Sequence, residues 1–130
     1  MSITIELKME PALQAALQGA PRLIEDAIHE ALVDLGMEIA NDARPRAAFK
    51  TGTLRRSIQV KEQPDGTVFV GSELPYAARI EYGFRGSDSR GRAYNQTPRP
   101  YMRPAFDENR GRAAGMVAAA LEAALRRIAS

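Results

Sequence analysis

The sequence "PRLIEDAIHEALVDLGMEIANDAR", residues 21–44, decides the fold of this chain. Its apolar residues recur at steps of three and four, and they are Leu23, Ile24, Ala27, Ile28, Ala31, Leu35 and Ile39. This spacing places them in one stripe along a helix that packs against a core. Glu25 and Asp26 lie in the expected first turn, where the helix dipole favours acidic side chains. Arg44–Pro45 predicts the end of the helix, because proline disfavours helical backbone in the residue before it.

Shorter segments with other patterns flank this helix. Residues 3–9, "ITIELKM", alternate apolar and polar side chains, which predicts a half-buried strand. Residues 10–19, "EPALQAALQG", predict a short helix that a proline opens and a glycine closes. Two alternating runs on either side of Pro64–Asp65–Gly66 predict a hairpin, since these three residues favour a tight turn.

The C-terminal half predicts less regular structure before a final helix. In residues 73–83, "ELPYAARIEYG", a proline and a glycine bound one or two helical turns. Residues 84–97 show no periodicity and predict a long exposed loop, which in a compact domain is usually functional. The last helix is expected from Pro104 to about Ile128. Glycines weaken its first half, which predicts either a bend near 109–111 or close packing of another backbone there. Its apolar stripe consists of Ala114, Val117, Ala118, Leu121, Ala124, Leu125 and Ile128.

The stretch "TPRPYMRPAF", residues 97–106, joins the loop to this helix. A linker, a nucleic-acid clamp, a peptide motif and the approach to a helix are the alternatives for such a stiff basic segment. Pro104 suits the first helical position, with Asp107 and Glu108 completing an acidic first turn. Tyr101 and Met102 are expected to form an apolar plug that docks on the domain or on a neighbouring subunit. We therefore favour a rigid hinge between the loop and the helix.

These elements predict an α+β fold for a single domain, residues 1–130. A small antiparallel sheet, made of the N-terminal strand and the hairpin, is expected to pack against two long helices, with short helices and one long exposed loop. The composition, 45% hydrophobic and 26% charged, is typical of a soluble globular protein. There is no cysteine, and no apolar run approaches the ~20 residues that span a bilayer. We expect the protein to stay in the cytosol where it is made.

The sequence offers little chemistry for catalysis. His29 is the one histidine and has no metal-ligand spacing with Glu25 or Glu30. Ser57 lacks the context of an activated nucleophile, and no phosphate-binding glycine motif is present. We predict no catalytic, cofactor or metal site. The stronger competitor is a small nucleic-acid-binding module, because residues 84–112 carry seven arginines against three acidic residues. A solvated arginine-rich loop is the structural alternative.

Four short stretches resemble a known family when taken in order. They are "TGTLRRSI" (51–58), "VGS" (70–72), "PYAARIEYG" (75–83) and "RPYMRPAF" (99–106). Together they resemble the small head–tail joining proteins, also called tail-completion or minor tail components, of long-tailed double-stranded DNA phages and prophages. The resemblance spans about residues 20–128. The motif residues to which it gives structural roles are Thr51, Gly52, Leu54, Ser57, Gly71, Pro75, Tyr76, Ala77, Glu81, Tyr82, Gly83, Pro100 and Pro104.

The resemblance implies a structural, non-enzymatic virion protein of the neck or tail. Such proteins form homo-oligomeric rings, commonly six-fold, between the head's connector or stopper and the tail-terminator or tail-tube proteins. Double-stranded DNA passes through the lumen with weak contact at most, and no membrane, cofactor or small-molecule substrate is implied. Residues 84–103 are our candidate contact arm. The candidate subunit-interface residues are Phe84, Arg85, Arg90, Arg92, Tyr94, Arg99, Tyr101, Met102 and Arg103.

Overall fold

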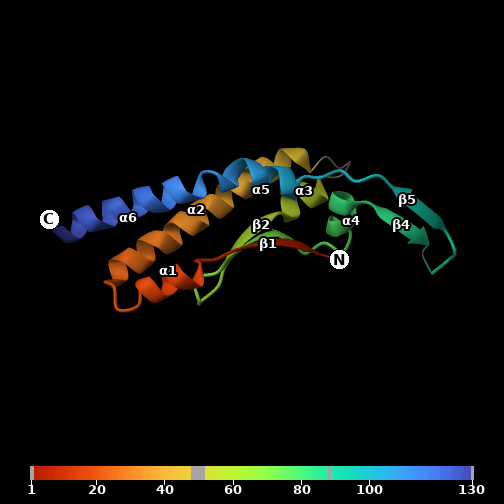
Figure 1. Ribbon diagram of the computed structural model, residues 1–130. Helices are drawn as coiled ribbons and strands as arrows, with labels where there is room; N and C mark the ends of the chain where they lie inside the picture. Colours follow the sequence, from red (N-terminus) through yellow and green to blue (C-terminus); the bar gives the residue numbers. More distant parts are fainter. Residues whose placement is uncertain (1, 48–51, 88, 130) are drawn as a thin grey trace.

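The computed structural model describes residues 2–47, 52–87 and 89–129 and has the predicted α+β architecture (Figure 1). Along the chain, the described elements are β1 (Ile3–Leu7), α1 (Pro11–Ala16), α2 (Arg22–Arg46), α3 (Thr53–Ser57), β2 (Gln59–Glu62), β3 (Val68–Ser72), α4 (Ala77–Tyr82), β4 (Phe84–Ser87), β5 (Ala93–Gln96), α5 (Met102–Arg110) and α6 (Ala113–Ala129). Within the described residues, no helix is both long and apolar enough to cross a membrane.

The main sheet has three antiparallel strands in the order β1-β3-β2. The N-terminal strand and the hairpin therefore form one sheet, as predicted. At the hairpin turn, the Gly66 N–H donates to the Gln63 carbonyl at 3.0 Å, and Gly66 has a φ of 90°. The Thr67 N–H donates to Asp65 Oδ1 at 3.0 Å, so the aspartate side chain supports the turn as expected.

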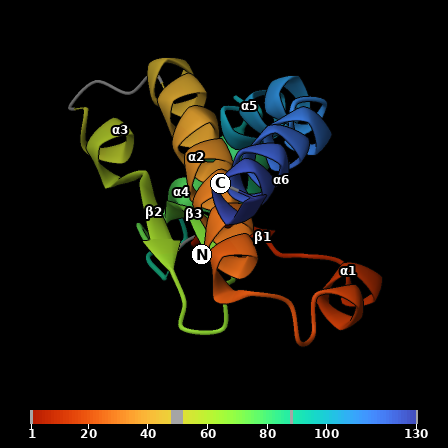
Figure 2. The same cartoon turned by 90° about the vertical axis from the view of Figure 1, so that its left-hand side faces the viewer.

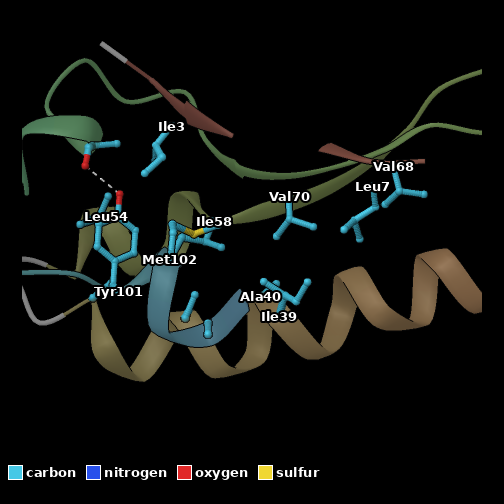
Figure 3. Packing of buried hydrophobic residues seen from close by; sticks show 14 of the residues in the cluster. Ile3, Leu7, Ile39, Ala40, Leu54, Ile58, Val68, Val70, Tyr101 and Met102 are labelled. Carbon is cyan, nitrogen blue, oxygen red and sulfur yellow. Dashed lines mark hydrogen bonds between the residues drawn. The ribbon is translucent and has the colours of Figure 1, made fainter. Parts of the chain in front are cut away.

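Helix α2 covers one face of this sheet (Figure 3). Ile39 and Ala40 are fully buried against Val68 and Val70 of the central strand. Gly36 lies where the helix comes closest to the sheet, because a Cβ there would be 3.1 Å from a Val68 methyl group. The predicted apolar stripe of α2 thus packs into the core.

The end of α2 differs from the prediction. The helix runs through Pro45 to Arg46 instead of ending at Arg44. Pro45 lies in the last turn, where its missing N–H removes only one helical hydrogen bond. The N–H of Ala47, two residues after the proline, still donates to the Ala43 carbonyl at 3.0 Å and closes the turn.

The expected last helix is divided into α5 and α6 by a break at 111–112. The glycine near the expected bend therefore marks a full interruption. Both helices lie along α2 (Figure 2), and Met102 and Ala105 of α5 share the core cluster with Val68 and Val70 of the sheet. Of the predicted stripe on α6, Ala124 alone is buried among the described residues, whereas Leu125 and Ile128 remain about half exposed.

Residues 84–97 do not form the irregular loop that the sequence predicted. Strands β4 and β5 pair antiparallel, with Phe84 opposite Gln96 and Ser87 opposite Ala93. The expected exposure is present, since the described residues from Arg85 to Pro100 are all exposed. A hairpin exposed on both faces has no buried face to impose an alternating pattern, which explains why periodicity did not reveal it.

Candidate functional site

The second hairpin projects away from the sheet and helices, beyond α4 (Figure 1). Of the candidate contact arm, residues 84–103, only residues 84–97 project in this way, and from here on we call these residues the arm. The chain enters the arm after the end of α4 and returns from it before the start of α5, so both ends of the arm attach to the body at one place. The arm is therefore a discrete appendage whose position depends on that junction.

A buried carboxylate holds this junction together. Glu81, near the end of α4, is only 3% exposed. Its Oε1 accepts the backbone N–H groups of Tyr101 at 3.1 Å and Met102 at 2.7 Å, and its Oε2 accepts that of Arg103 at 3.4 Å. These donors lie at the start of α5, where a helix has unpaired N–H groups and the positive end of its dipole. Glu81 thus caps α5 from another helix.

Two further hydrogen bonds fasten the same junction. The Tyr101 hydroxyl donates to the Ala77 carbonyl at 2.9 Å, inside the core (Figure 3). Burial, with a smaller contribution from the charge of Glu81, raises the pKa of Tyr101 well above its usual value. The Arg99 N–H donates to the Ile80 carbonyl at 2.8 Å. We call these contacts of α4 with residues 99–103 the clamp.

This clamp corrects the expected start of the last helix. Helix α5 begins at Met102, and Pro104 is its third residue. Asp107 and Glu108 consequently lie beyond the first turn. The start is earlier because Glu81 supplies the acceptors that the first N–H groups of the helix need.

Glycine is required where the arm meets the body. Gly83 has a φ of 77°, in the left-handed region that other residues avoid. A Cβ at this position would lie 2.7 Å from the Gln96 carbonyl oxygen and 2.9 Å from Pro98 Cδ. The two ends of the arm therefore cross so closely at its base that a side chain does not fit.

Side-chain contacts stiffen the arm near its base. The rings of Phe84 and Tyr94 lie on one face with centroids 6.2 Å apart. The guanidinium carbon of Arg79, in α4, lies 4.0 Å from the centre of the Phe84 ring, a cation–π contact between body and arm. Arg85 Nε donates to Asn95 Oδ1 at 3.1 Å across the hairpin. These contacts favour one orientation of the arm.

The predicted interface residues divide into two groups. Arg85, Arg90, Arg92, Arg99 and Arg103 are exposed, as an interface requires. Phe84 is half-buried, and Tyr94 is 36% exposed.

Tyr101 and Met102 are at most 1% exposed and lie in the chain's own core. The plug therefore docks on its own domain. Since a neighbouring subunit cannot reach these two side chains, the interface hypothesis does not extend to them.

Contacts between the first two motifs fasten α3 to the sheet. Ser57 Oγ donates to the Leu54 carbonyl at 2.6 Å and lies 2.6 Å from Ser72 Oγ. A Cβ on Gly71 would lie 2.0 Å from the Ile3 carbonyl oxygen, so glycine lets β1 and β3 pair here.

The other motif residues lie near these contacts or around α4. Gly52 has a φ of 71° at the start of α3. Ala77 is buried, Tyr76 is half-buried and Tyr82 is 70% exposed. Pro75 and Pro100 are exposed, and Thr51 lies outside the described residues.

The residues considered for catalysis have structural partners. His29 Nδ1 lies 3.3 Å from the Gly66 carbonyl oxygen and its Nε2 lies 3.4 Å from Glu62 Oε2, so it links α2 to the hairpin. Within the described parts of the chain, no group of three or more potential metal ligands occurs. The surface feature that stands out is the arm.

Sequence reasoning missed the role of Glu81. Its motif was noted, but its partners are 20 to 22 residues away in the chain. A carboxylate shortly before a left-handed glycine gives no local indication that it caps a distant helix. The only indication in the sequence was that the third motif, which contains Glu81, occurs together with the fourth, which contains its hydrogen-bond partners.

A family model described as "Bacteriophage HK97-gp10, putative tail-component" matches residues 11–83, more than half of the chain. A comparison with curated proteins found no match, and neither did a comparison with solved structures. The matched range contains α1 to α4, the hairpin β2–β3 and the first three motifs. It ends at the residue before the arm.

Proposed function

Because the chain belongs to the HK97-gp10-like family of bacteriophage tail components, we propose that it joins or completes the tail at the head–tail interface. In this proposal, copies of the chain form a ring in the neck, six-fold as in similar proteins, and double-stranded DNA passes through the lumen. The head connector or stopper lies on one side of the ring, and the tail-terminator or tail-tube protein lies on the other. Assembly takes place in the host cytoplasm.

The observation that carries this proposal is the arm on its clamp. A two-stranded hairpin exposed on both faces gains little stability from its own packing. Nevertheless a buried carboxylate, a buried tyrosine and a glycine that tolerates no side chain all serve to fix its base. Such a rigid, exposed, arginine- and tyrosine-containing projection is suited to contact another protein.

A ring also has geometric requirements that the arm can meet. A head-to-tail interface uses two different surfaces of each subunit, and it closes when the rotation between subunits fits. An arm at one end of the molecule provides one of these surfaces at a distance from the body (Figure 1). We assign the protein a structural and non-enzymatic role on this basis.

Shortening the arm tests the proposal. Replacing residues 86–94 with Asn-Gly would join the opposed pair Arg85 and Asn95 through a two-residue turn and leave the clamp intact. We expect this variant to fold with an unchanged melting temperature but to leave filled heads and free tails unjoined when it is the only copy in a phage assembly reaction. Electron microscopy and infectious titre provide the readouts.

The matched control keeps the length of the arm and all of its arginines, and it changes two other residues. Ser87→Ala and Ala93→Ser exchange the residues of one opposed pair and should assemble normally. Infectious particles at normal titre from the shortened variant would contradict the proposal.

The alternative, a nucleic-acid-binding module, makes a different prediction. The exposed arginines of the arm would then bind duplex DNA tightly, with affinity that falls steeply as salt increases. In the ring proposal, any contact with DNA in the lumen is weak, because a tight grip would oppose passage. Titration of labelled duplex at two salt concentrations separates these outcomes.

A further inference from the structure

A groove lies between α2 and α6, at the end of the molecule opposite the arm (Figure 1). It has a volume of about 460 Å³. Six alanines from the two helices line it, together with the apolar side chains of Leu23 and Met116. Asp26, Glu30 and Asp34 line it at successive four-residue steps on α2, so their carboxylates share one face of that helix.

These carboxylates form no ion pair within the described parts of the chain. Among the described residues, no ion pair or hydrogen bond reaches the side chains of Asp26, Glu30 or Asp34. The next acid in the same row, Glu38, does have one, since Arg112 Nη1 lies 2.9 Å from it. Arg127 also lines the groove, so the lining carries three acidic groups against one basic group. Like charges four residues apart on a helix repel one another, and a cationic partner would relieve that repulsion.

The arm has the complementary charge. Its sequence contains Arg85, Arg90 and Arg92 against the single acid Asp88, and Arg99 follows at its base. The described arginines of the arm are exposed. Because the arm and the groove lie at opposite ends of the molecule in Figure 1, an arm cannot enter the groove of its own chain. Among copies of this chain, the arm can therefore reach only the groove of another copy.

We propose that the arm of one copy docks in the α2–α6 groove of a second copy. Arginine side chains suit such a site, because their stems pack on an apolar floor while their charged ends reach the carboxylates on the rim. The contact is head-to-tail, so repeating it around a closed circle would generate a ring. This inference rests on the proposed function, since it names the partner surface of the same arm.

Introduced cysteines test the contact directly, because the natural chain contains none. Ser89→Cys places a thiol at the tip of the arm, and Ala123→Cys places one in the groove. In assembled particles oxidised with diamide, the double variant should give a ladder of disulfide-linked chains. A mixture of the two single variants should stop at dimers, which shows that the bond joins two copies. Ser89→Cys with Gln59→Cys, on the sheet edge, is the control and should give no ladder.

Charge exchange provides a second test that does not depend on disulfide geometry. Arg90→Glu/Arg92→Glu on the arm, or Glu30→Lys/Asp34→Lys in the groove, should each weaken self-association at least tenfold in analytical ultracentrifugation. Mixing the two variants should restore association, because each arm then meets a groove of opposite charge. Lys61→Glu/Arg110→Glu gives the same change in net charge as the arm variant, at two exposed sites away from both surfaces, and should have little effect.

The outcomes separate this inference from the proposed function. Absence of the cysteine ladder in intact particles, or unchanged association in both charge variants, would overturn the arm–groove contact. If arm variants nevertheless leave heads and tails unjoined, the arm binds another virion protein and the proposed function stands. If the shortened arm still gives infectious particles, the proposed function itself fails.

Discussion

At the scale of single residues, the arrangement of the arm depends on Glu81, which accepts backbone N–H groups from Tyr101, Met102 and Arg103. A buried N–H without an acceptor costs about 1–3 kcal/mol. Replacing this side chain therefore affects both the stability of the fold and the position of the arm.

We predict that Glu81→Ala lowers the free energy of unfolding by about 2–4 kcal/mol, because the start of α5 loses its acceptors. Glu81→Gln keeps one acceptor oxygen and should lose less. Urea denaturation measures the difference, and proteolysis near residues 97–100 reports the loosened arm. Equal stability of the alanine variant and the natural chain would show that Glu81 is not the cap described above.

Two glycines of the arm region with similar φ values allow a comparison. Gly83 and Gly91 have φ values of 77° and 79°, but a Cβ meets neighbouring atoms only at Gly83. We expect Gly83→Ala to destabilise the protein by at least about 1 kcal/mol more than Gly91→Ala, because a Cβ overlaps neighbouring atoms at Gly83 and meets nothing at Gly91. Thermal denaturation of the two variants gives the comparison. Equal losses of stability in the two variants would mean that the base of the arm can accommodate a side chain at no cost in free energy.

At the scale of elements, the turn of the hairpin β2–β3 has a pH-dependent part. Hydrogen bonds from Thr67 lower the pKa of the Asp65 carboxyl below its usual value. A group whose pKa is lower in the folded state stabilises that state above its unfolded pKa, and this contribution disappears as pH falls through the folded pKa.

The expected result is that Asp65→Ala is less stable than the natural chain at pH 7 and that the gap narrows below about pH 4, close to the unfolded pKa of aspartate. Chemical denaturation of both chains at several pH values measures the gap. Since the side chain is exposed, the effect should be small and should also decrease in high salt. A gap that widens toward low pH would contradict this account.

The elements also show what sequence patterns can reveal. Helix α2 was predictable because one face is buried along its whole length, and the first hairpin because Pro64–Asp65–Gly66 carries its own turn chemistry. The arm was not, since neither of its faces is buried. The division between α5 and α6 was expected at most as a bend. The local sequence shows where helix propensity is low, but it does not show whether packing on α2 will tolerate a break.

For the candidate site, the composition of the arm could be predicted from the sequence, but the contacts that hold the arm could not. The exposed arginines and the third and fourth motifs were recognisable one by one. Their connection through Glu81 depends on two segments that meet only after the chain has folded. Burial of Tyr101 and Met102 follows from the same meeting of the two segments, so the sequence alone could not place these side chains in the core.

At the scale of the whole molecule, we propose that residues 1–130 fold as a single domain. Helix α2 contacts the sheet on one side and both α5 and α6 on another, so the parts share one central element (Figure 2). Calorimetry should therefore show one unfolding transition whose calorimetric and van't Hoff enthalpies agree. The shortened arm should leave that transition in place. Two separate transitions would show that α6 and its contacts unfold independently.

The clamp has a consequence for how such a protein can diversify. It closes the chain at Gly83 and again at Arg99, so the body is complete whatever residues lie between these points. The family match ends at this same boundary. The arm is thus an exchangeable module: its length and charge can change, or be grafted from another chain, without repacking the core. In the proposed ring, a phage could alter which subunits recognise one another through a few residues of the arm and keep the rest of the fold.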